Sequence, residues 1–137
     1  MKAALDTLTP ALVAAILRAV PDAQALYAFG SQARGDANAE SDLDLAVLAP
    51  QPIPPLVRFA LQGELATIAG CDVDLVDLRS ANTVMRAQVY RSDLLLHEGD
   101  RHARQWFEML ALSDYARLNE ERRAILADVH ARGKVFG

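Results

Sequence analysis

The sequence of 137 residues contains one cysteine and no long apolar run. Because Cys71 is the only cysteine, no disulfide can form within the chain; this favours a reducing compartment, and we expect Cys71 to act as a small buried hydrophobe. No apolar run approaches the ~20 residues that a membrane-spanning helix requires. Asp6 stands where a signal peptide would be basic, and Arg18 and Asp22 interrupt the apolar stretch that follows. We therefore expect a cytoplasmic protein without a membrane segment.

Basic residues are also in short supply. Fourteen Lys and Arg residues stand against eighteen Asp and Glu residues, which gives a net charge of −4. A protein that binds nucleic acid normally carries excess Lys and Arg to neutralise phosphates, so we expect no direct nucleic-acid binding. The apolar fraction of 52% is that of a globular protein. The length predicts one domain over residues 1–137, with a core over about 1–98 and C-terminal helices over about 100–132.

The most informative stretch contains a Gly-Ser pair followed by two aspartates. The pair Gly30-Ser31 follows an apolar strand, and ten residues separate Ser31 from Asp42, which is followed at the second position by Asp44. Residues i and i+2 of a strand point to the same face, so Asp42 and Asp44 are expected to project together. Two adjacent carboxylates repel one another unless a cation lies between them, and their oxygens suit Mg²⁺.

The Gly-Ser turn predicts a phosphate site beside these carboxylates. Gly30 lacks a Cβ, so a ligand can approach the backbone closely, and the free N–H groups of a turn opened by Ser31 can bind an anion. Arg34 either contacts a triphosphate or is an ordinary surface charge, and Ser41 caps or orients the carboxylate strand. The alternative is a Gly-Ser turn beside an Asp-rich strand edge without function. A phosphate cradle one strand away from a metal-binding carboxylate pair is what nucleotidyl transfer requires.

The segment GSQARGDANAESDLDLAVL, from Gly30 to Leu48, resembles the signature of the minimal nucleotidyltransferases (MNT proteins) of the DNA polymerase β superfamily. It is most similar to MNT antitoxins that are paired with HEPN-domain RNase toxins. The resemblance implies a mixed α/β, polymerase-β-like fold, with a small mixed sheet flanked by helices and a helical C-terminal segment. It also implies a third carboxylate from a later strand. Asp74 lies at that position, Asp72 is the runner-up on the same strand face, and Asp77 lies on the opposite face.

The resemblance further implies the chemistry. Asp42, Asp44 and Asp74 would be the catalytic residues and would hold two Mg²⁺ ions. The nucleotide donor would be ATP, and the residues expected to bind it are Gly30, Ser31, Arg34 and Ser41. Such an antitoxin transfers AMP to a tyrosine of its HEPN toxin, with release of pyrophosphate, and so neutralises the RNase.

Two other functions remain open from the sequence. In the first, the chain is a small-molecule nucleotidyltransferase that transfers the nucleotide to an aminoglycoside-type drug without any partner protein. An antitoxin that only covers its toxin would instead use the helices over residues 106–129. Masking alone needs no metal ligands, so the complete set of carboxylates favours an enzyme.

Cap residues and apolar periodicity predict the elements that carry these motifs. Three helices are expected before residue 91: one started by Thr9 as N-cap and Pro10 and ending before Pro21; Leu56–Ala69, with Gly70 as its stop; and Asn82–Tyr90, with Ser80 as its N-cap. Four strands are expected: Gln24–Phe29; a carboxylate strand that ends at Leu48-Ala49; Asp72–Leu78; and a well-buried strand over Leu94–Gly99. The prolines of Pro50–Pro55 predict a stiff connector.

From Asp100 to about Arg132 the pattern is helical. Ser113-Asp114 is a possible division into two helices. The apolar stripe of this segment is expected either to fold back on the sheet or to form an exposed docking face, alone or combined with that packing. His97, His102 and His130 show no metal-ligand spacing and are expected to be surface or capping residues.

Overall fold

The structure, a computed structural model, describes residues 5–30, 42–91 and 93–132. Within these residues the centre of the fold is a four-stranded sheet with the order β3-β2-β1-β4. Strand β1 (Ala25–Phe29) is antiparallel to both β2 (Leu43–Leu48) and β4 (Leu94–Glu98), whereas β2 is parallel to β3 (Val73–Asp77). A small mixed sheet flanked by helices confirms the expected mixed α/β fold class.

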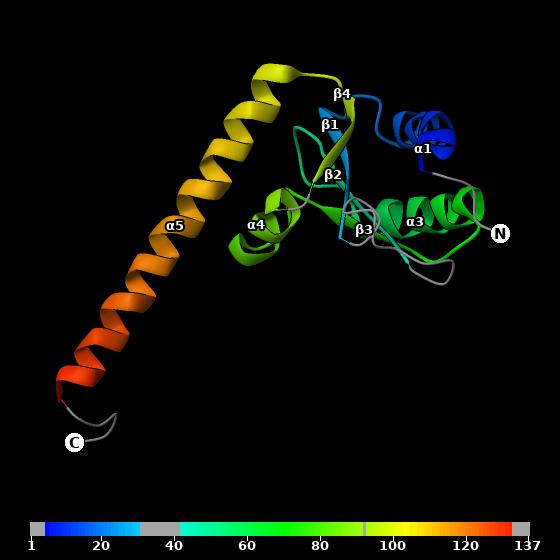
Figure 1. Cartoon of the computed structure of the whole chain (residues 1–137). Helices are drawn as coiled ribbons and strands as arrows, with labels where there is room; N and C mark the ends of the chain where they lie inside the picture. Colours follow the sequence, from blue (N-terminus) through cyan, green and yellow to red (C-terminus); the bar gives the residue numbers. More distant parts are fainter. Residues whose placement is uncertain (1–4, 31–41, 92, 133–137) are drawn as a thin grey trace.

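The helices cover the two faces of the sheet unequally (Figure 1). Helices α1 (Leu5–Ala19) and α3 (Pro55–Ala69) pack on one face, and α4 (Thr83–Arg91) with the start of α5 (Arg101–Arg132) packs on the other. Side chains of β1 alternate between the two cores, and all five of its residues are buried. Because both cores hold β1, the end of this strand at Phe29 is fixed in position.

The first helix begins earlier than the sequence predicts. It starts at Leu5 and runs through Pro10, and the Thr9 hydroxyl donates a hydrogen bond to the carbonyl oxygen of Leu5 over 2.9 Å, so Thr9 is not an N-cap. Leu5 and Leu8 pack against the buried α1–α3 core. Burial of these two side chains explains why the helix extends past the expected start.

The caps of α3 and α4 show one prediction confirmed and one wrong. Gly70 ends α3 in the left-handed conformation, with its N–H bonded to the carbonyl of Ala66, as expected. The N-cap of α4 is Asn82, whose side-chain oxygen accepts a hydrogen bond from the N–H of Met85 over 2.8 Å. Ser80, the expected cap, instead donates its hydroxyl to Asp77.

The remaining helix and strand boundaries agree with the sequence to within about two residues. Helix α3 buries Leu61, Leu65 and Ala69, whereas Leu56 and Phe59 in its first turns are exposed. Cys71 is half-buried against the α1–α3 core, with a free thiol.

Strand β4 is not well buried, contrary to the sequence expectation. Leu94 and Leu95 are 45% and 39% exposed. The physical reason is incomplete cover: a cleft of about 400 Å³ lies between the first turns of α1 and residues Leu94, Leu95 and Leu96 of this edge strand.

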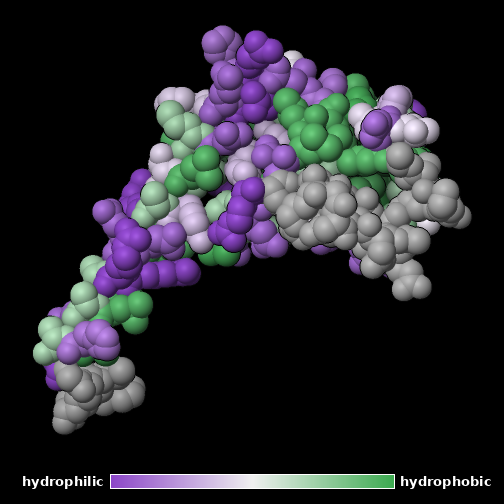
Figure 2. All heavy atoms as spheres, viewed as in Figure 1, coloured by the Kyte–Doolittle hydropathy of each residue, from purple (hydrophilic) through white to green (hydrophobic). Residues whose placement is uncertain are grey.

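Helix α5 is continuous across Ser113-Asp114, so the possible division there is absent. Its first turns pack on the domain through Phe107 and Ala111, and its distal part extends away from the sheet (Figures 1 and 2). The segment therefore combines both expectations, because one part folds back and the other stays exposed. Over the described residues, no helix has the length and apolar character that a membrane span needs.

A buried carboxylate holds the connections around β3. Asp77 is 5% exposed and accepts hydrogen bonds from the N–H of Ile53 over 2.8 Å, the Ser80 hydroxyl over 2.9 Å and the N–H of Arg79 over 3.1 Å. It lies on the strand face opposite to Asp74, as expected, and its three bonds tie the proline connector to the end of β3. This fixes the position of the strand that carries Asp74.

We predict that Asp77→Ala lowers the free energy of unfolding by about 3 kcal/mol, because it leaves the buried N–H of Ile53 without an acceptor. Urea denaturation monitored by circular dichroism measures the change. Asp22→Ala, at an exposed turn position, is the control and should change stability by less than about 0.5 kcal/mol. Equal stability of the two variants would contradict a structural role for Asp77.

Candidate active site

Two carboxylates meet at one end of the sheet. The parallel register of β2 and β3 places Asp44 directly beside Asp74. The antiparallel register of β1 and β2 places Phe29 on the other side of Asp44. Residues in register on neighbouring strands, about 4.8 Å apart, project to the same face of a sheet. Asp74, Asp44 and Phe29 therefore form one row across three strands.

Gly30 lies against this row. Its φ of +72° is in the left-handed region that glycine adopts without strain. A Cβ at this position would lie 2.5 Å from Oδ2 of Asp44, so any side chain at residue 30 would force the Asp44 carboxylate to move. Glycine at position 30 lets the turn after β1 approach this carboxylate without displacing it.

The carboxylates repel one another. Burial raises the pKa of Asp44 above its ordinary value, and the negative charges of Asp74 and Asp42 raise it further. A divalent cation would relieve this repulsion, and Mg²⁺ commonly takes one or two carboxylates and completes its coordination with water and substrate phosphates. In the parts of the chain that the structure describes, no group of three or more His, Cys, Asp or Glu side chains is placed to hold a metal ion. The carboxylates of Asp44 on β2 and Asp74 on β3 are hard oxygen ligands of the kind that Mg²⁺ prefers.

Asp42 is exposed and immediately precedes β2. The N–H of Leu43 donates to the carbonyl oxygen of Asp72 over 2.9 Å, so Asp42 and Asp72 enter their strands side by side. Asp72 is exposed but is not among the charges that shift the pKa of Asp44, whereas Asp42 and Asp74 are. The electrostatics favour Asp74 over Asp72 as the partner of Asp44.

Three of the expected nucleotide-binding residues, Ser31, Arg34 and Ser41, lie outside the described residues. Gly30 is the expected nucleotide-binding residue that the structure describes, and it lies at the carboxylate row.

The sequence did not point to a further carboxylate at this end of the sheet. Leu94 pairs with Ala28, so Asp93, one residue earlier, lies level with Phe29. Asp93 thus immediately precedes the edge strand β4 (Leu94–Glu98), beside the end of β1. Strand order is what reveals this position, and strand order is not encoded in any local motif.

Comparison with known proteins agrees with this geometry. Residues 13–102 match the family described as "Polymerase beta, Nucleotidyltransferase". The protein adenylyltransferase MntA of Shewanella oneidensis is 40% identical over 112 residues, which cover 82% of this chain and 80% of that protein.

Solved structures show the same similarity. A toxin–antitoxin structure with AMP-PNP matches with a TM-score of 0.79 at 36% identity, covering 89% of this chain and 98% of that chain. A complex of the tri-AMPylated HEPN toxin of Shewanella oneidensis with its MNT antitoxin matches with a TM-score of 0.75 at 34% identity, covering 91% and 98%. The chain described here therefore belongs to the polymerase β nucleotidyltransferase family.

Proposed function

We propose that this chain is a Mg²⁺-dependent protein adenylyltransferase, an antitoxin that transfers AMP from ATP to a tyrosine of a HEPN-domain toxin. The observation that carries the proposal is the close approach of Gly30 to Asp44, with Asp74 in register beside it. The similarity to MntA, and to a complex that contains an AMPylated HEPN toxin, supports the choice of donor and acceptor.

The proposed site residues have different roles in the reaction. Gly30 leaves room for the triphosphate to approach the row of carboxylates, and Ser31, Arg34 and Ser41 are proposed to bind its phosphates. Asp42, Asp44 and Asp74 would hold two Mg²⁺ ions, which neutralise charge on the phosphates and stabilise the attacking and leaving oxygens. The protein mainly positions the reactants and contributes little covalent chemistry of its own.

Asp74 is the carboxylate best placed for the acceptor. It is exposed on β3, at the edge of the sheet, whereas Asp44 is flanked by strands on both sides. Asp74 is therefore assigned the role of accepting the proton of the incoming tyrosine hydroxyl. The phenolic oxygen then forms a bond to the α-phosphorus, the bond between that phosphorus and the bridging oxygen breaks, and pyrophosphate leaves.

We predict that the chain, incubated with ATP, Mg²⁺ and the HEPN protein encoded beside it, adds AMP to a tyrosine of that protein. Intact-mass and peptide mass spectrometry locate the adduct. The double variant Asp42→Ala/Asp44→Ala should form no adduct and should fail to protect cells from the toxin.

Two results would contradict the proposal. Full protection of cells by the double variant, with no adduct from the unaltered chain, would indicate neutralisation by masking. Transfer of labelled AMP to an aminoglycoside in the absence of the HEPN protein would indicate a small-molecule enzyme.

We predict that Gly30→Ala lowers the rate of AMP transfer by about a hundredfold, because the added methyl group displaces the Asp44 carboxylate from the phosphates. Gly63→Ala is the matched control, since a Cβ at Gly63, inside α3, meets no atom within 4 Å. That control should retain full activity and gain up to about 1 kcal/mol of stability. Wild-type activity of Gly30→Ala would show that the close approach is irrelevant to catalysis.

We predict that Asp44→Asn abolishes AMP transfer and yet stabilises the metal-free protein at pH 7. The gain should be about 0.5 kcal/mol, because solvent screens the repulsion around a half-exposed carboxylate. Thermal unfolding in EDTA measures it, with Asp22→Asn as the control for loss of one charge. A decrease in stability would mean that Asp44 has a structural role instead.

A further inference from the structure

The two edges of the sheet differ in how their backbone groups are covered. At the β3 edge, Leu75 donates its N–H to the side chain of Gln62 over 2.9 Å, and Arg58 donates to the carbonyl oxygen of Leu75 over 3.3 Å. At the β4 edge, no side chain among the described residues is bonded to the backbone of residues 94–96. Because side chains that occupy edge backbone groups prevent another strand from adding to a sheet, the β3 edge is closed and the β4 edge is open.

An apolar cleft runs along this open edge, on the face of the sheet that carries α1. Its volume is about 400 Å³, and Leu94 and Leu95 beside it are 45% and 39% exposed. Its walls are residues 94–96 of β4 and four residues of α1: Leu5, Asp6, Thr9 and Pro10. A strand that added to the β4 edge would place alternate side chains over this cleft and bury the two leucines.

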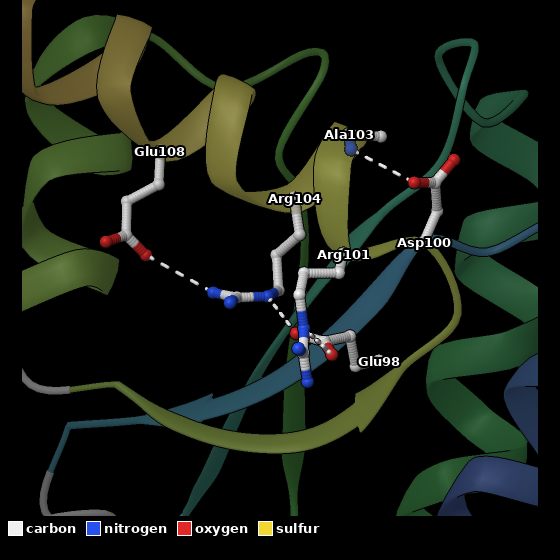
Figure 3. A network of polar contacts seen from close by, with 6 residues as sticks. All are labelled: Glu98, Asp100, Arg101, Ala103, Arg104 and Glu108. Carbon is white, nitrogen blue, oxygen red and sulfur yellow. Dashed lines mark hydrogen bonds and ion pairs between the residues drawn. The ribbon is translucent and has the colours of Figure 1, made fainter.

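Helix α5 brings a further apolar side chain to the other face of the same edge. Arg104 binds Glu98 of β4 over 2.6 Å, and Glu108, one turn further along α5, is 3.7 Å from Arg104 on the same side of the helix (Figure 3). Residues four apart lie one above the other on a helix, so Leu112 is the next residue of this row. Leu112 is 43% exposed, and it therefore flanks the β4 edge from the face opposite to the cleft.

The charges of β4 are compatible with pairing between two copies of this strand. Antiparallel pairing that overlaps all of Leu94–Glu98 requires Leu96 on a two-fold axis, which places Glu98 of one copy opposite Leu94 of the other. Glu98 is already neutralised within its own chain by Arg101 over 3.0 Å and Arg104 over 2.6 Å. No like charges face each other across such a pair, and the three leucines meet uncharged or neutralised neighbours.

We propose that the free edge of β4 pairs antiparallel with β4 of a second copy of this chain, so that the two sheets form one continuous sheet. The interface is isologous, because the same strand, cleft and side of α5 serve both copies. It is independent of the proposed function: β1 lies between β4 and the two strands that carry Asp44 and Asp74, so both active sites stay accessible.

The first experiment compares the unaltered chain with Leu94→Lys/Leu112→Lys by sedimentation equilibrium, without ATP or any partner protein. The unaltered chain should show a monomer–dimer equilibrium. The variant should raise the dissociation constant by about tenfold or more, because lysines at a strand edge oppose pairing and repel one another across the axis. Leu56→Lys/Phe59→Lys is the matched control, since both leucine and phenylalanine are exposed on α3, and it should dimerise like the unaltered chain.

The second experiment measures hydrogen exchange of the unaltered chain by mass spectrometry at low and high protein concentration. Exchange of the backbone amides in residues 94–98 should slow by about tenfold or more as dimer forms, while exchange in α3 stays unchanged. This measurement needs no substitution, so it tests the inference even where the lysine variant is unstable.

Three outcomes would overturn the inference. The first is a chain that stays monomeric up to about 100 μM. The second is a dimer that the α3 variant breaks and the β4 variant does not, since the interface would then lie on α3. The third is protection of residues 94–98 that appears only with the HEPN protein encoded beside the chain, in a complex where no two copies of this chain pair. Each result is obtained without AMP transfer, so failure of the proposed function would leave this inference standing, and the reverse.

Discussion

The geometry of the active site depends on one close approach, that of the Gly30 backbone to the carboxylate of Asp44. It requires a residue without a Cβ, a positive φ, and two strands that cannot shift relative to each other. The last condition comes from the fold. Strand β1 is buried by helices on both faces and paired with β2 and β4 on both edges, so its C-terminal end is held in place. A catalytic turn at the end of such a strand is positioned by the whole core of the domain.

The position of Asp44 also brings its carboxylate into electrostatic repulsion with the carboxylate of Asp74. Asp44 and Asp74 lie in register and raise the cost of ionising Asp44, which disfavours the metal-free folded state. Active sites commonly carry this kind of local instability, which the bound ligand relieves. Asp77 illustrates the contrast: it lies three residues after Asp74 on the other face of β3, but it is buried with three hydrogen bonds and serves the structure. The alternation of a strand thus separates a functional carboxylate from a structural one.

Local sequence signals were sufficient for most elements and for part of the site. The period-2 pattern separated Asp74 from Asp77, and Gly70 marked the end of α3, because both depend on neighbouring residues alone. Local sequence signals gave wrong predictions where contacts between residues far apart in the chain determine the structure. Thr9-Pro10 is a good helix start, but burial of Leu5 and Leu8 extends α1. Leu94 and Leu95 are exposed because a cleft separates β4 from the start of α1. Asp93 was missed for the same reason, since only the pairing of β1 with β4 places it near the end of β1.

The most direct measurement of the central claim is a crystal structure of this chain with AMP-PNP and Mg²⁺. The account predicts metal density between the carboxylates of Asp44 and Asp74, with the triphosphate against the backbone of Gly30. Nucleotide bound elsewhere, or Asp42, Asp44 and Asp74 pointing apart with no ion among them, would contradict it.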